Sequence, residues 1–175
     1  MGLKGGPTQD EVMAVSLLKL RIREGDVMAD IGCGTGKISI QASERCRRVY
    51  AVDRRAEAVE YARQEIETAE IENITLIHGE ASHALDEMNR LDCAFVGGSG
   101  EIETVLEKLT EIVRGRIVVN AVLLDTVSRT VRKMRELGIF VEALHIQVSR
   151  SYDLAGDLMF KPLNPVYIIV GEVKQ

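Results

Sequence analysis

The chain has 175 residues, of which 46% are hydrophobic and 28% are charged, a length that fits one domain spanning residues 1–175. Its 22 basic and 27 acidic side chains give a net charge of −5, which argues against a dedicated nucleic-acid-binding protein. The sequence has no uncharged apolar run of about 18 residues and no signal-peptide pattern, so we expect neither a membrane span nor secretion.

The cysteines Cys33, Cys46 and Cys93 lie far apart in the sequence and form no CxxC pair. This spacing disfavours a disulfide framework and a zinc ribbon, and it indicates a protein of the reducing cytoplasm. The three histidines show no metal-ligand grouping, so the sequence predicts no metal site.

Helical and extended segments alternate along most of the chain. Thr8 and Glu11 form a T-x-x-E capping box, which predicts a helix that continues through residues 12–22. Strands are then predicted at 27–31, 48–53, 74–78, 92–96 and 115–122. Helices are predicted between or after them at 36–46, 56–70, 82–88, 101–113 and 125–137. This alternation is typical of βαβ crossovers and a parallel sheet.

The pattern changes after residue 138. Residues 139–150 and 164–173 form two extended runs with no helix of adequate length between them, so they should pair antiparallel. The segment between them, 151–163, is predicted to be a long loop. The sequence therefore predicts an α/β fold with a seven-stranded, mostly parallel, Rossmann-like sheet, an antiparallel terminal strand pair and helices on both faces.

A glycine-rich turn follows the first predicted strand, with the sequence Asp30-Ile31-Gly32-Cys33-Gly34-Thr35-Gly36. It is neither a P-loop nor a dinucleotide fingerprint, because Lys37 stands where GxGxxG requires its third glycine. GxGxG with an acidic residue two positions before its first glycine is the pattern of S-adenosylmethionine (SAM) binding. We expect Asp30 to accept a hydrogen bond from the ammonium group of SAM, either directly or through a water molecule.

Two acidic residues follow the next two predicted strands. Asp53 is placed to accept hydrogen bonds from both ribose hydroxyls, although it also fits a helix N-cap. Glu80 fits an adenine ligand or an exposed turn carboxylate equally well. Cys33 is not expected to be a nucleophile, because no paired histidine follows it.

Seven segments, spread from residue 5 to residue 172, carry a resemblance to a known family that extends over nearly the whole chain. They are GGPTQDEV (5–12), ADIGCGTGKISIQAS (29–43), RRVYAVDRRAEAVEYARQ (47–64), HGEASHAL (78–85), FVGGSG (95–100), NAVLLDTVSRTVRKMRELG (120–138) and NPVYIIVGE (164–172). The chain resembles the cobalt-precorrin-6B carbon-15 methyltransferases (decarboxylating) of cobalamin biosynthesis, a family of class I SAM-dependent methyltransferases. FVGGSG is the most distinguishing segment, because most SAM enzymes carry other sequences there.

The resemblance implies the cofactor-binding residues. They are Thr8, Gly32, Cys33, Gly34, Thr35, Gly36, Asp53 and Ala81. Glu80 replaces the family's more usual aspartate, and residues 149–163 match only loosely, which puts substrate contacts there in doubt. The segment NPVY resembles the NPPY signature of amino-group methyltransferases, but that signature belongs after the fourth strand, so we assign Asn164 no catalysis.

The implied substrate is a tetrapyrrole, a cobalt-precorrin, bearing many carboxylates. Candidate cations for it are Arg54, Arg55, Arg150 and Lys161, and the glycines of GGSG would let a flat ring approach the methyl donor. No catalytic residue is assigned, since the conjugated ring can itself accept the electrons of decarboxylation. Alternatives are a SAM-dependent methyltransferase acting on RNA or another small molecule, and a non-catalytic scaffold.

The last strands also suggest an assembly. Residues 139–150 carry apolar side chains on both faces, which favours a subunit interface. The resembled family is tetrameric, so we expect a homo-oligomer, most simply a tetramer, with residues 139–163 at an interface near the substrate cleft.

Overall fold

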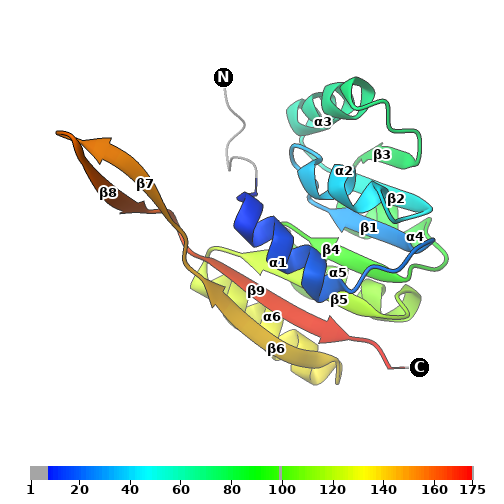
Figure 1. Cartoon of the computed structure of the whole chain (residues 1–175). Helices are drawn as coiled ribbons and strands as arrows, with labels where there is room; N and C mark the ends of the chain where they lie inside the picture. The colour runs from blue at the N-terminus through cyan, green and yellow to red at the C-terminus, as the bar shows by residue number, and fades with distance from the viewer. Residues whose placement is uncertain (1–7, 99, 175) are drawn as a thin grey trace.

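A seven-stranded sheet forms the centre of the molecule (Figure 1). The computed structural model describes residues 8–98 and 100–174. Within them the strands are β1 (Val27–Ile31), β2 (Arg48–Asp53), β3 (Ile74–His78), β4 (Cys93–Val96), β5 (Arg116–Ala121), β6 (Phe140–Ile146), β7 (Ser149–Leu154), β8 (Asp157–Pro162) and β9 (Val166–Glu172). The order across the sheet is β3-β2-β1-β4-β5-β9-β6. Strand β9 runs antiparallel to both β5 and β6, and the strands from β3 to β5 pair in parallel.

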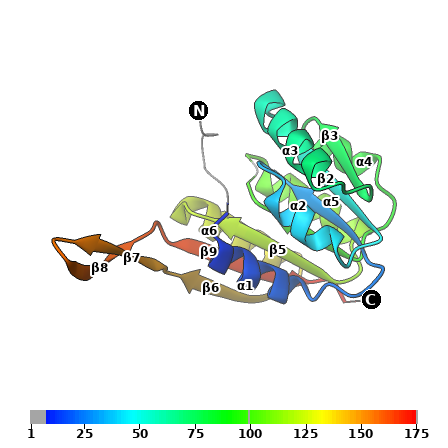
Figure 2. The ribbon, with the colours of Figure 1, turned by 45° about the horizontal axis from the view of Figure 1, so that its top comes forward.

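Helices cover both faces of this sheet (Figures 1 and 2). They are α1 (Asp10–Leu20), α2 (Lys37–Ser43), α3 (Ala56–Thr68), α4 (Ala81–Asp86), α5 (Ile102–Ile112) and α6 (Leu124–Glu136). Helices α1, α2 and α3 lie on one face, and α4, α5 and α6 lie on the other. This arrangement of sheet and helices confirms the predicted fold class.

None of the helices in the described part of the chain has the length and apolar character needed to span a membrane.

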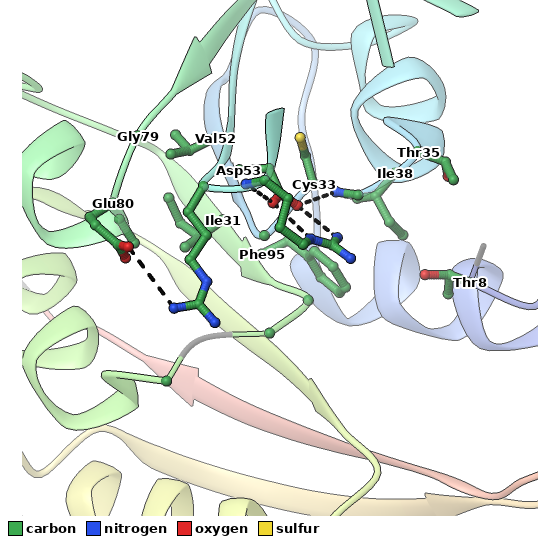
Figure 3. Close-up of a pocket in the computed structure, with 18 of the residues that line it drawn as sticks. Thr8, Ile31, Cys33, Thr35, Ile38, Val52, Asp53, Gly79, Glu80 and Phe95 are labelled. Atoms are coloured by element: carbon green, nitrogen blue, oxygen red, sulfur yellow. Dashed lines mark hydrogen bonds and ion pairs between the residues drawn. The ribbon is translucent and has the colours of Figure 1, made fainter. Parts of the chain in front are cut away.

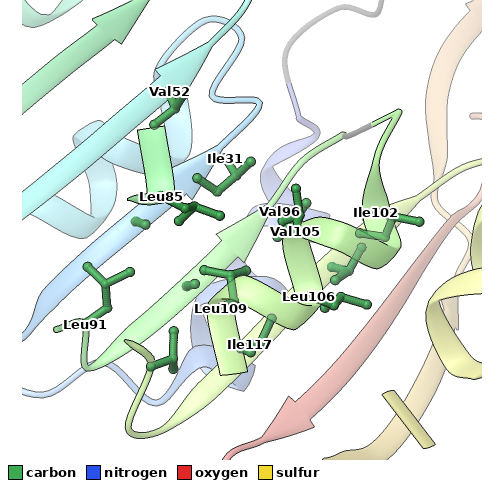
Figure 4. Packing of buried hydrophobic residues seen from close by; sticks show 14 of the residues in the cluster. Ile31, Val52, Leu85, Leu91, Val96, Ile102, Val105, Leu106, Leu109 and Ile117 are labelled. Carbon is green, nitrogen blue, oxygen red and sulfur yellow. The ribbon is translucent and has the colours of Figure 1, made fainter. Parts of the chain in front are cut away.

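The central strands are buried from both sides, which explains their nearly continuous apolar sequences. Successive side chains of a strand point to opposite faces, so Phe95 and Val96 enter two different core clusters. Val96 packs with Leu106 and Leu109 of α5 on one face (Figure 4). Phe95 belongs to the cluster on the other face, which includes Val12 of α1. This packing fixes the carboxyl ends of β1 and β4 beside each other.

The predicted capping box is wrong. Helix α1 begins at Asp10 with Gln9 as its N-cap, and no side chain caps its first turn. The helix therefore starts one residue later than a box built on Thr8 requires. Instead, the Thr8 carbonyl oxygen accepts a hydrogen bond of 2.9 Å from Nζ of Lys37, which ties the start of α1 to α2.

The predicted loop at 151–163 is also wrong. The extended run after α6 stops at Ile146, and β7 and β8 then form an antiparallel hairpin that projects away from the sheet (Figure 1). Its turn consists of Ala155 and Gly156, with φ values of 53° and 91°. Positive φ at both central residues is what a type I′ turn requires, and this turn matches the twist of the two strands.

Strand β6 carries apolar residues on both faces because its pairing with β9 shifts register between Phe140 and Glu142. Phe140 packs with the cluster under α6, whereas Leu144 and Ile146 pack with the cluster on the opposite face. A bulge of this kind reverses the alternation of side chains along a strand. It explains why Phe140 is out of phase with the apolar residues that follow.

Candidate functional site

A cleft of about 490 Å3 lies at the carboxyl ends of β1, β2 and β4 (Figure 3). It is lined by Thr8, Ile31, Gly32, Cys33, Gly34, Thr35, Lys37, Ile38, Val52, Asp53, Arg54, Arg55, Gly79, Glu80, Ala81, Phe95, Gly97, Gly98, Gly100 and Glu101. Every residue in the predicted cofactor set lines this cleft except Gly36. Ligands of open α/β sheets bind at this edge, outside the carboxyl ends of the strands.

The glycine loop between β1 and α2 forms the floor of the cleft. Gly32, Gly34 and Gly36 have φ values of 72°, 57° and 76°, in the left-handed region that side chains rarely adopt. Gly36 has a different task from the other two. A Cβ atom there would lie 3.2 Å from Cβ of Ala62, so this glycine lets α2 pack closely against α3.

The loop after β4 packs directly on this glycine loop. The Gly97 amide donates to the Ile31 carbonyl oxygen at 2.8 Å. A Cβ atom on Gly32 would lie 2.5 Å from the Gly98 carbonyl oxygen, and one on Gly97 would lie 3.0 Å from the Gly32 carbonyl oxygen. Gly97 therefore serves close contact between two backbones, whereas a Cβ atom on Gly98 would meet nothing within 4 Å. The serine of GGSG, at position 99, lies outside the described residues.

Asp53, at the end of β2, is the most highly organised polar group in the cleft. It is 4% exposed, and its Oδ2 accepts a hydrogen bond of 2.9 Å from the Gly34 amide. Its Oδ1 accepts from the Arg55 amide at 3.0 Å, and the Arg55 side chain also binds the carboxylate. Burial pushes the pKa of Asp53 upward, but the hydrogen bonds from Arg55 and Gly34 outweigh it and hold the pKa below its ordinary value. Asp53 is thus a carboxylate at neutral pH.

Asp30 is fully buried and is not among the residues that line the cleft. Its Oδ2 accepts a hydrogen bond from the Ser39 hydroxyl, and its Oδ1 has no hydrogen-bond partner among the described residues. Burial raises the pKa of Asp30 to about 7. The carboxyl group therefore makes no direct contact with the cleft, and a hydrogen bond from it to a ligand there would have to pass through a bridging group.

The raised pKa of Asp30 predicts a pH-dependent stability. An unfolded aspartate titrates near pH 3.9. Between about pH 4 and pH 7 the folded state binds more protons than the unfolded state, so the free energy of unfolding falls as the pH rises. Asp30→Asn removes this titration, so the wild type should lose stability relative to the variant across that window and no further above it.

Urea unfolding of the two proteins across this pH range measures the difference. Asp86→Asn is the matched control, because Asp86 is 59% exposed and pairs with Lys108. A wild type whose stability relative to Asp30→Asn does not change between about pH 4 and pH 7 would contradict the account.

Further charged side chains surround the cleft. Nζ of Lys37 lies 2.5 Å from Oδ1 of Asp10, and Arg54 lies 4.0 Å from Glu80 at the exposed rim. Lys37 and Glu101 were not singled out as site residues from the sequence. For Lys37 a signal existed, since it follows the last glycine of the loop directly.

Two of the four predicted cations for a polyanionic substrate lie elsewhere. Arg54 and Arg55 line the cleft, whereas Arg150 and Lys161 are paired residues of the β7–β8 hairpin. Arg150 also lies 3.0 Å from Glu11 of α1.

The Cys33 thiol lies in the wall of the cleft, yet burial raises its pKa far above the ordinary value. It therefore lacks the thiolate character of a nucleophile. Asn164 lies outside the cleft, just before β9, as the sequence predicts for the start of the last strand. No group of three or more metal-ligand side chains occurs among the described residues.

Comparison with known proteins identifies the family of this fold and site. A model of the precorrin methyltransferase domain matches residues 4–172. The chain belongs to the precorrin methyltransferase family. A relative from Methanosarcina acetivorans, described as a probable cobalt-precorrin-6B C(15)-methyltransferase (decarboxylating), is 49% identical over 98% of this chain and 96% of its own length. A relative of the same description from Methanosarcina mazei is 47% identical over the same shares.

Solved structures of family members have the same architecture. The crystal structure of precorrin-8W decarboxylase from Methanobacterium thermoautotrophicum matches with a TM-score of 0.92 and 34% identity, covering 95% of this chain and 91% of that one. Precorrin-6Y C5,15-methyltransferase from Geobacter metallireducens also matches with a TM-score of 0.92, at 33% identity over 98% and 94% of the two chains. These comparisons confirm the family that the sequence motifs indicate.

Proposed function

We propose that this protein uses SAM to methylate carbon 15 of a cobalt-precorrin and that it decarboxylates an acetate side chain of the same macrocycle, as a step of cobalamin biosynthesis. One observation carries the proposal. A chain of the precorrin methyltransferase family gathers its glycine loop, Asp53, Thr8 and Ala81 around a single cleft.

The residues of the cleft fit SAM. The glycine loop leaves backbone close to the cleft where side chains would fill it, and Asp53 offers a fixed carboxylate to a ribose. Ala81 and Glu80, at the start of α4, fit the edge of an adenine. The cofactor supplies an activated methyl group. The chain's own residues bind and orient the reactants. Alignment of the methyl donor with its acceptor makes a large contribution to methyl transfer by itself.

The reaction needs no nucleophile from the protein. A carbon atom of the macrocycle would provide the electron pair for the new bond to the methyl group that SAM supplies, and S-adenosylhomocysteine would be the leaving group. In decarboxylation, the bond between the acetate methylene and its carboxylate would break and release carbon dioxide, and the electron pair of that bond would enter the conjugated ring before a proton is added. The loops after β4 and β2 present Gly98, Gly100 and Arg54 at the cleft, where a carboxylate-bearing ring could be held.

Transfer of an isotopically labelled methyl group from SAM tests the proposal. Label should enter a cobalt-precorrin acceptor, and Asp53→Ala should lower this transfer sharply. Glu57→Ala, which removes an exposed carboxylate from the first turn of α3, serves as the matched control. Label that enters RNA and not the cobalt-precorrin would overturn the proposed substrate and favour an RNA methyltransferase.

We also infer that the chain assembles as a homotetramer in the cytoplasm. The three free, buried cysteines suit a reducing compartment. The β7–β8 hairpin supports assembly, because its apolar side chains are exposed. They are Tyr152, Leu154, Leu158, Met159 and Phe160, with exposures of 43% to 64%. An isolated two-stranded hairpin has little stability of its own in water, so contacts with another subunit would stabilise it.

Two substitutions in the hairpin, Leu158→Glu and Phe160→Glu, should therefore dissociate the assembly. We expect light scattering to give a mass well above 19.4 kDa for the wild type and a mass near 19.4 kDa for the double variant. Leu18→Glu is the control, since Leu18 is 73% exposed on α1 outside the hairpin. A wild-type mass of 19.4 kDa at micromolar concentration would refute the assembly.

A further inference from the structure

The carboxylate of Asp53 is already occupied by hydrogen-bond donors (Figure 3). The Gly34 amide and one terminal nitrogen of Arg55 donate to Oδ2, at 2.9 and 3.1 Å. The Arg55 amide and Nε donate to Oδ1, at 3.0 and 3.1 Å. A carboxylate offers about four lone-pair directions, so these donors leave little room for others.

Only some of these donors can leave. The Gly34 amide is fixed by the glycine loop, and the Arg55 amide is fixed because Arg55 is the N-cap of α3. The Arg55 side chain is 37% exposed and lines the cleft, and a Cβ atom on Gly34 would lie 3.8 Å from its guanidinium group. The guanidinium group therefore lies above the glycine loop, on the side from which a ligand approaches Asp53.

We propose that the Arg55 guanidinium group occupies the ribose position of the cleft in the free protein and is displaced when a nucleoside with vicinal hydroxyl groups binds Asp53. This inference rests on the proposed use of SAM. The two ribose hydroxyls replace Nε and the terminal nitrogen as donors to the carboxylate, while both backbone donors stay in place. Arg55 is thus a side chain that sets nucleoside affinity by competition.

Competition makes a distinctive prediction, because removing the side chain should strengthen binding. Arg55→Met keeps the aliphatic stem and removes the guanidinium group. A partly exposed ion pair of this kind corresponds to about a fivefold change in affinity, so Arg55→Met should bind S-adenosylhomocysteine about fivefold more tightly than the wild type. Salt weakens such an ion pair, so wild-type affinity should rise with ionic strength and that of Arg55→Met should not.

Calorimetric titration with S-adenosylhomocysteine tests this on the full chain. Arg63→Met is the matched control, because Arg63 is a 52% exposed arginine of α3 that pairs with Glu60 and does not line the cleft. Its affinity should equal that of the wild type. The 2′,3′-dideoxy analogue of S-adenosylhomocysteine, which lacks the donors to Asp53, should gain nothing from Arg55→Met.

The outcomes separate this inference from the proposed function. Equal or weaker binding by Arg55→Met would overturn the inference and assign Arg55 the task of holding Asp53 in position. No binding by any of the three proteins would overturn the proposed function and the inference together. A second readout uses the wild type alone and so does not depend on the stability of the variants. In nuclear magnetic resonance, the Nε–H proton of Arg55 should be protected from exchange with water in the free protein and should lose this protection when S-adenosylhomocysteine binds. Protection that persists in the complex would overturn the inference.

Discussion

Asp53→Ala should weaken SAM binding about 30- to 150-fold, which corresponds to roughly 2–3 kcal/mol for losing a charged acceptor of two hydrogen bonds. The structure gives the physical reason. Asp53 is 4% exposed, its position is fixed by the Gly34 amide, and the pKa of its carboxyl group is held low, so it is preorganised as an acceptor. Calorimetric titration with SAM measures the loss.

Two comparisons make this result specific to the cleft. Glu57→Ala removes a carboxylate of the same charge from the exposed first turn of α3 and should leave the affinity unchanged. The free energy of unfolding of Asp53→Ala should be measured alongside, because Gly34 and Arg55 also lose a hydrogen-bond partner. A folded Asp53→Ala protein with wild-type affinity for SAM would exclude Asp53 from the site.

Gly32→Ala should lower the free energy of unfolding more than any other glycine-to-alanine substitution in the glycine loop. Its φ of 72° costs an alanine about 1–2 kcal/mol, and the new Cβ atom would lie 2.5 Å from the Gly98 carbonyl oxygen. The clash is with backbone, so the loops after β1 and β4 must separate. We expect a total loss of about 3 kcal/mol or more, together with loss of SAM binding.

Gly138→Ala is a control that isolates the clash. Gly138 has a φ of 70°, but a Cβ atom there would meet nothing within 4 Å. Urea denaturation should therefore show a loss of about 1–2 kcal/mol for this variant, from backbone strain alone. If Gly32→Ala and Gly138→Ala lost the same free energy of unfolding, the contact between the loops after β1 and β4 would not be what constrains Gly32.

The glycine loop could be predicted from the sequence because its chemistry is local. Three glycines with fixed spacing directly after an apolar strand predict a tight turn, and Gly32, Gly34 and Gly36 all have positive φ. The different task of Gly36 could not be predicted in the same way. Its neighbour Ala62 lies on another helix, and a contact between α2 and α3 has no signature in the spacing of either segment.

The β7–β8 hairpin was missed because its turn lacks the usual sequence signal. Type I′ turns favour Asn-Gly or Asp-Gly, since asparagine and aspartate tolerate positive φ. Here Ala155 takes that position with a φ of 53°. All residues of both strands are exposed, so the alternation of buried and exposed side chains that marks a strand is also lacking.

The ion pair between Arg55 and Asp53 could not be predicted from the sequence either. The sequence places Arg55 two residues after Asp53, a spacing that fits a solvated charge as well as an ion pair. Only the side-chain geometry shows both carboxylate oxygens bound by the guanidinium group. The sequence thus predicted that Thr8, Asp53 and Ala81 meet the glycine loop in one cleft, whereas the contacts among these residues required the fold.

The most direct test of the proposed function is the mass of the product formed from a purified cobalt-precorrin-6B and SAM. The account predicts a product that has gained one methyl group and lost one carbon dioxide, formed by the wild type and strongly reduced in Asp53→Ala. A cobalt-precorrin recovered with unchanged mass, from a wild-type protein that binds SAM, would contradict it.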